Sequence, residues 1–278
     1  MKKIIVTADK SDRLLKILEK QAPEYNYSSF VKALRQKDII VNGARQKENI
    51  IVPKQCEIIC YVDDSALKKN MFDIVYSDDN LVIINKASGI ETCDGNYNMV
   101  SELGKQGLTV FPVHRLDRNT LGLVIFAKSI EIQKKLIEEF KSGNVSKLYY
   151  AEVVGNPQKK ATLRGYLVKD KDESVVKVYD KKVPGSDSIT TKYETIKQNG
   201  NVALLKVEIK EGKTHQIRAH LAYNKLYIIG DGKYGKNEIN TKYKAKTQHL
   251  KAYKILFNLA DNSLKYLNNL ELELDNRF

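Results

Sequence analysis

Apolar and polar positions recur with two different periods along the chain, and the change of period divides it into three parts. Between residues 12 and 62, apolar residues at helical spacing are followed by short β-branched runs. Residues 63–71 carry charges of both signs and little hydrophobic periodicity, which is typical of a linker. From residue 72 onward, β-branched and aromatic runs dominate. We therefore predict an N-terminal module over residues 1–62, a linker over 63–71 and a larger domain over 72–278.

The N-terminal module is predicted to hold two helices and a small sheet. In DRLLKILEKQ, four apolar residues share one helical face, and Ser11 or Asp12 precedes them as a cap. A second helix is expected from near Ser28. The run IIVNG predicts a strand that ends in the turn Asn42–Gly43, because Asn-Gly is a strong hairpin signal. The segment NIIVPKQCEIICYV predicts two further strands.

The C-terminal domain is predicted to be α+β with a mostly antiparallel mixed sheet. Runs rich in β-branched or aromatic residues predict the strands DIVYS, NLVIINK, GLVIFAK, KLYYAEVVG and VALLKVEIK. One helix is expected from about Ile130 to Lys141, between Ser129 and Gly143, and another after Thr214. Two helices are too few to cover both faces of a parallel sheet, so we expect antiparallel pairing.

Composition adds a polyanionic partner to this picture. The 278 residues include 47 Lys+Arg against 34 Asp+Glu, a net charge of +13. Such an excess favours binding to nucleic acid, although membrane surfaces and plain solvation of lysines are alternatives that composition leaves open. No apolar run approaches the roughly 18 residues of a membrane span, and the N-terminal one is too short for a signal peptide, so we expect a cytoplasmic protein. The three cysteines are expected to be reduced thiols.

The most informative chemistry lies in the segment FPVHRLDRNTLGLVIFAK, where a charged loop runs into an apolar strand. His114, Arg115 and Arg118 surround Asp117. Neighbouring positive charge favours an ionised carboxylate, which can act as a nucleophile toward a sugar carbon or an electron-poor ring. The segment alone leaves open that this aspartate is structural and pairs with an arginine at a strand entrance.

The segment HRLDRNTLG resembles the HRLD signature of the RluA-type pseudouridine synthases. Four other blocks resemble segments of that family in the expected order, namely NLVIINKASG (80–89), KLYYAEVVG (147–155), GKTHQIRAHLA (212–222) and IIGDGKYG (228–235). The resemblance covers most of residues 72–257. In addition, the helix-helix-hairpin order with Lys32, Arg35, Lys37 and the VNG turn resembles the S-four-like RNA-binding domain, named after a small-subunit ribosomal protein.

The resemblance implies a sheet with a central cleft and a role for three residues in it. Asp117 takes the position of the family's nucleophile, Tyr149 that of its active-site tyrosine, and Arg218 that of the arginine that pairs with the nucleophile. The aromatic ring of Tyr149 suits stacking on uracil, and its hydroxyl suits proton transfer at C5. Arg218 is expected to orient Asp117 through a charge-assisted hydrogen bond.

RNA contacts are expected from other basic residues. A uridine in folded RNA must leave its stack to reach a carboxylate. Arg115, supported by His114, is our candidate to occupy the space that the uridine vacates. Arg118, together with Lys32 and Arg35 of the N-terminal module, is expected to bind RNA.

The implied reaction needs neither a cofactor nor a metal, because isomerising uridine involves no redox change and no external donor. Whether the aspartate attacks the ribose C1′, adds at C6 or assists an elimination is left open by the sequence. The S-four-like module favours ribosomal RNA over transfer RNA as the substrate. We expect a monomer.

Two other functions are compatible with parts of this pattern. The chain could be a non-catalytic RNA-binding or assembly factor that retains the fold, although the complete set of Asp117, Tyr149 and Arg218 argues against this. A glycosidic hydrolase would need a second carboxylate. Asp94 and Asp231 are the acids available to it, but each directly precedes a glycine, which favours a role in a turn.

Overall fold

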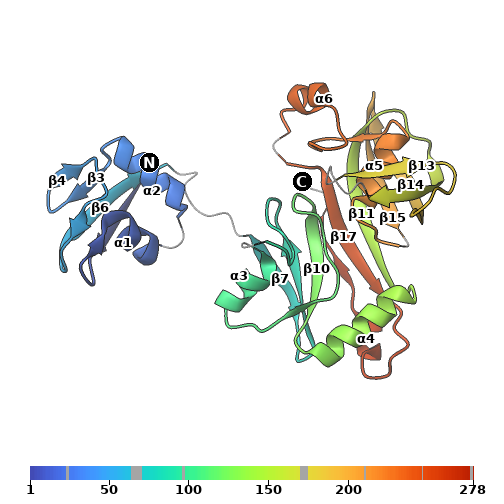
Figure 1. Ribbon diagram of the computed structural model, residues 1–278, viewed down its shortest axis with the longest axis horizontal. Coiled ribbons are helices and arrows are strands. Elements are labelled where there is room, and N and C mark those ends of the chain that lie inside the picture. The colour runs from blue at the N-terminus through green and yellow to red at the C-terminus, as the bar shows by residue number, and fades with distance from the viewer. Residues whose placement is uncertain are drawn as a thin grey trace. The chain divides into compact units, whose positions relative to one another are not determined.

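The chain forms two compact units, Met1–Asn70 and Met71–Phe278 (Figure 1). The computed structural model describes residues 1–22, 25–63, 71–95, 98–169, 175–209, 211–245, 247–275 and 278. Most of the expected linker over 63–71 therefore lies outside the described residues. Each unit has a hydrophobic core of its own, so each is considered by itself.

The N-terminal unit is a small sheet with two helices. Its main sheet has the order β1 (Lys2–Thr7), β6 (Glu57–Val62), β3 (Ile39–Val41) and β4 (Ala44–Gln46), and β2 (Asp12–Arg13) pairs with β5 (Ile51–Val52). The turn between β3 and β4 is the predicted one, with Asn42 at φ 45° and Gly43 at φ 84°. Both residues thus have the positive φ that a two-residue hairpin turn requires.

The two helices of this unit pack apolar faces on the sheet. They are α1 (Leu14–Gln21) and α2 (Tyr27–Arg35). The four apolar residues predicted to share one face of the first helix are all buried, which confirms the periodicity argument. The cap expected from Ser11 or Asp12 is wrong, because Arg13 occupies the N-cap position and makes no side-chain capping bond.

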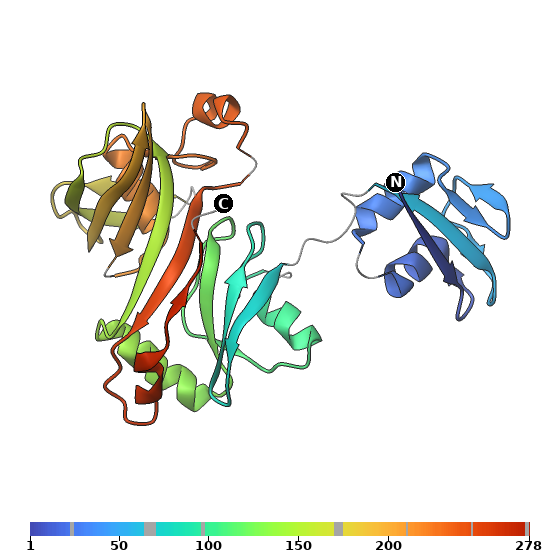
Figure 2. The same cartoon turned by 180° about the vertical axis from the view of Figure 1, so that it is seen from behind.

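The C-terminal unit is built on one large sheet, which confirms the α+β class with mostly antiparallel pairing. Its described strands are β7 (Phe72–Ser77), β8 (Leu81–Lys86), β9 (Phe111–Pro112), β10 (Leu121–Ala127), β11 (Val145–Val154), β12 (Lys160–Lys169), β13 (Val176–Tyr179), β14 (Asp187–Asn199), β15 (Val202–Ile209), β16 (Tyr227–Ile228), β17 (Leu250–Phe257) and β18 (Leu272–Glu273). The main order is β13-β12-β14-β15-β11-β17-β10-β8-β7. Among the described strand pairs, β10 and β17 alone run parallel, and Figure 2 shows β17 between β10 and β11.

The apolar runs LVII and LVIF mark strands that are covered on both faces. In β8, Val82 and Ile84 point into one hydrophobic cluster, whereas Leu81 and Ile83 point into another on the opposite face. Strand β10 divides its side chains between the same two clusters. Because neither face meets water, these strands read as continuous apolar segments rather than as alternating ones.

The helices of this unit can be compared with the helix starts that the sequence predicted. They are α3 (Met99–Lys105), α4 (Ile130–Lys141), α5 (Gln216–Tyr223), α6 (Asn237–Lys242) and a 3₁₀ helix (Lys265–Asn269). Helix α4 has the predicted bounds, with its N-cap Ser129 accepting a hydrogen bond from the N–H of Ile132 at 3.2 Å. The helix predicted after Thr214 is α5, and His215 occupies its N-cap position. None of the helices in the described part of the chain has the length and apolar character to span a bilayer.

The parallel contact between β10 and β17 depends on Gly122. Its φ is +110°, and it lies opposite Ala252 in the register. A Cβ atom at this position would lie 2.1 Å from the carbonyl oxygen of Ala252. The absence of a side chain therefore allows the two strands to approach, and this contact joins the β7–β10 part of the sheet to the part that contains β11.

We expect the substitution Gly122→Ala to lower the free energy of unfolding by about 3 kcal/mol or more, because it adds both a backbone clash and an unfavourable φ. Urea unfolding measures this loss. Gly104→Ala is the matched control, since a Cβ there meets no atom within 4 Å and lies in helix α3. The control should be neutral or up to about 1 kcal/mol more stable. Equal stability of the two variants would contradict the assigned role of Gly122.

Candidate active site

Asp117 lies in a short loop between β9 and β10 whose backbone is held from within the protein. The buried Thr92 hydroxyl donates to the carbonyl of Leu116 at 3.0 Å and accepts from its N–H at 3.1 Å. On the other side, the carbonyl of Arg118 accepts a hydrogen bond from the Nζ of Lys86 at 3.0 Å. Because both flanking residues are fixed, the main chain sets the position of the Asp117 carboxylate.

Lys86 is a fully buried cation that ties the end of β8 to this loop. Its Nζ also donates to the carbonyl oxygens of Ala87 at 2.9 Å and Ile90 at 3.0 Å. Together with the bond to Arg118, these contacts use all three N–H groups of the ammonium. Burial lowers the pKa of Lys86 to about 8, and the nearby charges of Glu91 and Asp117 oppose that shift.

Arg218 reaches Asp117 from helix α5 while a second carboxylate holds it in place. Its Nε and Nη2 donate to the two carboxylate oxygens of Asp231 at 2.7 and 2.9 Å. Its Nη1 donates to Oδ2 of Asp117 at 2.9 Å. A bidentate pair fixes both the position and the plane of a guanidinium. The N–H directed at Asp117 is therefore aimed by Asp231.

Asp231 is itself fixed and ionised. Its carboxylate accepts hydrogen bonds from the backbone N–H groups of Lys233 at 2.8 Å and Tyr234 at 3.0 Å, and only 1% of the residue is exposed. Burial alone would raise its pKa, but the contact with Arg218 and the two backbone donors lower it below the ordinary value. Burial likewise opposes the charge on Arg218, whereas the carboxylates of Asp231 and Asp117 raise its pKa above the ordinary value.

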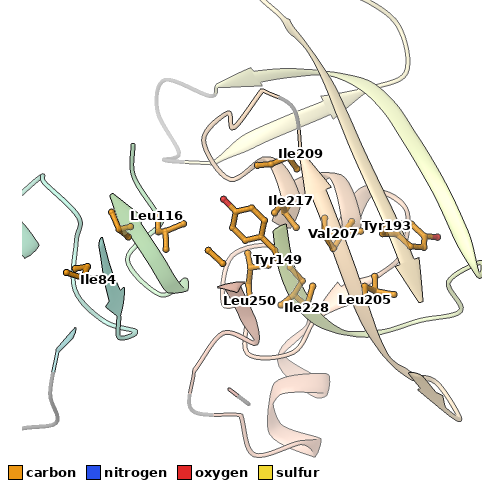
Figure 3. Packing of buried hydrophobic residues seen from close by; sticks show 14 of the residues in the cluster. Ile84, Leu116, Tyr149, Tyr193, Leu205, Val207, Ile209, Ile217, Ile228 and Leu250 are labelled. Carbon is orange, nitrogen blue, oxygen red and sulfur yellow. The ribbon is translucent and has the colours of Figure 1, made fainter. Parts of the chain in front are cut away.

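Tyr149 is placed by the central strand β11. It lies opposite Val207 in β15 and Ala252 in β17, and the pairing with β17 shifts register between Leu148 and Tyr149. The ring belongs to the hydrophobic cluster of this unit, and the hydroxyl points away from Leu205, as Figure 3 shows. The ring of Tyr149 is thus packed in the core, while its hydroxyl faces the pocket described below.

Burial, and then the negative charge of Asp117, raise the pKa of Tyr149. The hydroxyl therefore keeps its proton near neutral pH. In this resting state it can donate a hydrogen bond, but it is a weak base.

His215 is a further residue beside the carboxylate. Its Nε2 lies 3.9 Å from Oδ2 of Asp117, and its Nδ1 lies 2.9 Å from the hydroxyl of Tyr234. It has a left-handed backbone conformation with φ 54°. Burial lowers the pKa of His215 more than the charge of Asp117 raises it, so the ring is neutral at pH 7.

One pocket brings together Asp117, Tyr149 and Arg218, with His215 and Lys147 also in its wall. Among the described residues that line it, Asp117 is the only carboxylate. The side chain of Asp117 is 21% exposed and that of Arg218 is 7% exposed. The pocket thus offers one accessible acid, held by one buried guanidinium, next to an aromatic ring.

Comparisons with known proteins identify this arrangement. The sequence profile of the family described as RNA pseudouridylate synthase matches residues 79–223, which include Asp117, Tyr149 and Arg218. The chain belongs to that family. The protein is therefore an RNA pseudouridine synthase, and the resemblance seen in the sequence is confirmed.

Curated relatives and solved structures agree with this assignment. The synthase is 32% identical over 255 residues to a ribosomal large subunit pseudouridine synthase C of Rickettsia felis, a match that covers 82% of this chain and 83% of the relative. It is 27% identical to a ribosomal large subunit pseudouridine synthase D of Haemophilus influenzae, covering 80% and 73%. The structure of human RNA pseudouridylate synthase domain containing 4 matches with a TM-score of 0.60 at 23% identity, covering 73% of this chain and 87% of that one, which shows a shared fold.

His114 of the synthase packs against neighbouring elements of its own unit. Its Nε2 accepts a hydrogen bond from the N–H of Ile125 at 3.1 Å, and its ring packs on Phe140 with centroids 5.1 Å apart. Burial, and then the charge of Lys147, place its pKa well below the ordinary value. The neutral ring thus links the Asp117 loop to β10 and α4, while the residue is partly exposed, and its role in RNA binding stays a prediction.

Arg115 and Arg118 are exposed on either side of Asp117. Arg115 forms an ion pair with Asp94 and lies 4.0 Å from Glu91. The Nε of Arg118 donates to the carbonyl of Gly89 at 3.1 Å. Arg115 also lines the pocket, whereas Arg118 does not.

The predicted RNA-binding residues of the N-terminal unit are both exposed on helix α2. Lys32 pairs with Asp63, and Arg35 is the last residue of the helix. The structure leaves their role in RNA binding as a prediction.

Sequence reasoning missed the second carboxylate of the site. Asp231 was interpreted as a turn residue because Gly232 follows it, and its two backbone hydrogen bonds do belong to a turn. The contact with Arg218 is a separate function that no local pattern shows. Lys86 and Lys147 were also missed, since a lysine in a strand ordinarily indicates an exposed position.

We expect Asp231→Asn to lower the free energy of unfolding by about 3–5 kcal/mol at pH 7, because it leaves the buried Arg218 with one carboxylate. The folded-state pKa of Asp231 is lowered, so its contribution is present at neutral pH and is lost as the pH falls through that value. The difference between wild type and variant should therefore shrink at about pH 3.

Urea unfolding at the two pH values measures this difference. Asp187→Asn is the matched control, because Asp187 pairs with Lys213 at 3.0 Å but is 57% exposed. Its loss should stay below about 1 kcal/mol. A similar loss for both variants would show that Arg218 does not depend on Asp231.

Proposed function

We propose that this synthase isomerises specific uridines of structured RNA, ribosomal RNA being the first candidate, with Asp117 as the nucleophile. The observation that carries the proposal is the ion pair between Asp117 and Arg218 in a pocket that Tyr149 also lines. The guanidinium orients the carboxylate, and the partial exposure of Asp117 leaves it open to a substrate.

The isomerisation breaks the bond between N1 and C1′ and joins C1′ to C5, with a proton lost at C5 and one gained at N1. A carboxylate is nucleophilic enough to bond to C1′ or to C6 and stable enough to leave again. One oxygen of Asp117, Oδ2, is engaged by Arg218 and faces His215. We therefore assign the attack to Oδ1. Arg218 stabilises the negative charge of the carboxylate when its bond to the substrate breaks.

Tyr149 is proposed to stack on the uracil and to act at C5. Its raised pKa opposes proton abstraction in the resting enzyme, partly because Asp117 is negatively charged. That charge disappears when the carboxylate becomes an ester. The pKa of the hydroxyl then falls, so the tyrosinate that can accept the C5 proton forms more readily after Asp117 has formed its covalent bond, which orders the two steps.

The RNA contacts proposed from the sequence fit the exposed basic residues that flank the pocket. Arg115 would fill the space left by the extruded uridine, and to do so it must leave Asp94. An exposed ion pair of this kind contributes at most about 1 kcal/mol, so breaking it costs little. Arg118, Lys32 and Arg35 remain proposed phosphate contacts. The N-terminal module is proposed to be S-four-like and to bind RNA independently of sequence.

The hydrolase alternative needs a second acid, and Asp117 is the one carboxylate among the described residues that line this pocket. Asp231 is buried against Arg218 with a lowered pKa, and Asp94 pairs with Arg115. A general acid must carry a proton near neutral pH, which the environment of Asp231 opposes. The relatives are named ribosomal large subunit pseudouridine synthases, and these names support ribosomal RNA as the proposed substrate.

We expect Asp117→Asn to abolish pseudouridine formation, by at least about 10⁴-fold, because an amide is not a nucleophile. Position-by-position pseudouridine mapping of total RNA, with and without the protein, reports both activity and target. Asp79→Asn is the control, because Asp79 is an exposed turn residue of β7–β8. RNA binding by Asp117→Asn should persist. Isomerisation by this variant would contradict the assignment of Asp117 as the nucleophile. An unchanged pseudouridine map in cells that lack the gene would favour a non-catalytic assembly factor.

The same reaction mixture separates an isomerase from a hydrolase. Isomerisation leaves the mass of the RNA unchanged, whereas hydrolysis releases free uracil and leaves an abasic site. Release of uracil in proportion to the lost uridine would exclude our proposal.

We expect Tyr149→Phe to lower kcat by about 10²–10⁴-fold, the usual range for loss of a proton-transfer group. The KM should change little, because the ring that stacks on uracil remains. Steady-state kinetics on the RNA identified by mapping measures both quantities. A kcat within about threefold of wild type would limit Tyr149 to stacking.

A further inference from the structure

Four cations line the pocket of Asp117, and three of them have carboxylate partners within the protein. Arg115 pairs with Asp94, Lys213 pairs with Asp187 at 3.0 Å, and Arg218 pairs with two carboxylates. The fourth cation is Lys147. Among the residues that the structure describes, no carboxylate lies within 4.0 Å of its Nζ.

Lys147 points into the pocket from the same strand as Tyr149. The two residues are two positions apart in β11, and they lie opposite Ile209 and Val207 of β15. Side chains two positions apart in a strand share a face. The Nζ lies 5.0 Å from the centroid of the Phe140 ring.

The surroundings of Lys147 leave its charge uncompensated. Burial lowers its pKa to about 8. The ring of Phe140 offers a cation–π contact, which replaces only part of the lost hydration. A partly desolvated ammonium without a carboxylate is a site for an anion that the protein does not supply.

We propose that Lys147 binds the phosphate that adjoins the target uridine, and so positions the ribose for attack by Asp117. This inference rests on the proposed function, because it takes RNA as the substrate. A uridine nucleotide brings a single kind of charge to the pocket, on its phosphate, since the uracil ring is neutral. The phosphate therefore supplies the counter-charge that the pocket lacks.

Gly212 leaves room for such a ligand close to the ammonium. Its φ is +67°, and a Cβ at this position would lie 3.3 Å from the Nζ of Lys147. Because glycine has no Cβ, the backbone at Gly212 borders the ammonium without covering it. Both residues line the pocket, so the phosphate would lie between the start of β11 and the loop that precedes α5.

Few other groups near the pocket change charge between pH 6.5 and 9. The titratable and charged groups around Lys147 are His114, Arg115, Asp117, Tyr149, Lys213, His215 and Arg218. Both histidines have lowered pKa values, and those of Tyr149 and Arg218 are raised. Lys86, with a pKa of about 8, is the other group that must be separated from Lys147.

The kinetic test compares Lys147→Met, Lys147→Arg and the control Lys192→Met on the RNA identified by mapping. We expect Lys147→Met to raise KM by about ten- to a hundredfold and to change kcat by less than about threefold, because a charged hydrogen bond is lost. Lys147→Arg should restore KM to within about threefold. Lys192 lies on the opposite face of the sheet, in β14, and is exposed. An unchanged KM in Lys147→Met, with thermal unfolding confirming the fold, would overturn the proposal.

The pH dependence separates binding from base catalysis by its sign. If the protonated ammonium binds phosphate, the wild-type KM is lowest below pH 8 and rises as the amine of the free enzyme loses its proton. Lys147→Arg should lose this rise. If the rise persists in Lys147→Arg, Lys86 causes it and the proposal fails. A kcat that increases through pH 8 and is abolished in Lys147→Arg would show instead that Lys147 is a base.

A binding measurement identifies the phosphate and does not depend on turnover. In the Asp117→Asn background, RNA with a neutral methylphosphonate beside the target uridine should bind about tenfold more weakly than unmodified RNA. In Asp117→Asn/Lys147→Met, the two RNAs should bind equally. A tenfold difference that remains in the double variant would place the phosphate elsewhere. If Asp117→Asn still isomerises uridine, the assignment of Asp117 as the nucleophile is wrong, whereas the phosphate contact of Lys147 is tested separately by this binding measurement.

Discussion

The double engagement of one guanidinium is the constraint on which the site depends. Arg218 gives two N–H groups to Asp231 and one to Asp117. A flexible arginine could follow a carboxylate in several directions, whereas one clamped by a buried partner presents a single direction. The two carboxylates thus differ in environment although they share a cation. Asp231 is buried and accepts hydrogen bonds from several donors. Asp117 is partly exposed, and within the described part of the chain its Oδ1 accepts no hydrogen bond. This difference makes one of them structural and leaves the other available to a substrate.

The sheet brings these groups together from distant parts of the chain. Asp117 and Arg218 are 101 residues apart, and Tyr149 lies between them in sequence. Strand β17 makes this possible because it pairs with β11 on one side and, in parallel, with β10 on the other. The close approach at Gly122 sets the entrance of β10 against Ala252, a few residues after the Asp117 loop. Lys86 fastens the same loop to β8 through backbone carbonyls. The main chain of the loop therefore sets the position of Asp117, and the sheet brings Arg218 and Tyr149 to it.

The sequence predicted those features that depend on local pattern. Helix α4, the Asn42–Gly43 turn and the strand assignments followed from periodicity and capping, which act over a few residues. Asp117 was a candidate from the basic residues around it, whereas Tyr149 and Arg218 were assigned through a family resemblance. The role of Asp231 could not be predicted, because its partner is brought to it by tertiary structure. The same holds for the contacts of the His114 ring with Ile125 and Phe140, which tertiary structure brings to it.

Desolvation explains why a pocket rich in basic residues can use a single acid. Burial keeps His215 neutral and Tyr149 protonated, so neither competes with the substrate for the charge of Asp117. Arg218 remains charged in the same environment because two carboxylates oppose the cost of its burial. Lys147 has no such partner among the described residues, and its charge is least stable before the substrate arrives. The ammonium of Lys147 has already lost part of its hydration, so an anionic ligand beside it stabilises its charge. The substrate would thereby complete the electrostatic balance of the site, with its phosphate at Lys147 and its sugar at Asp117.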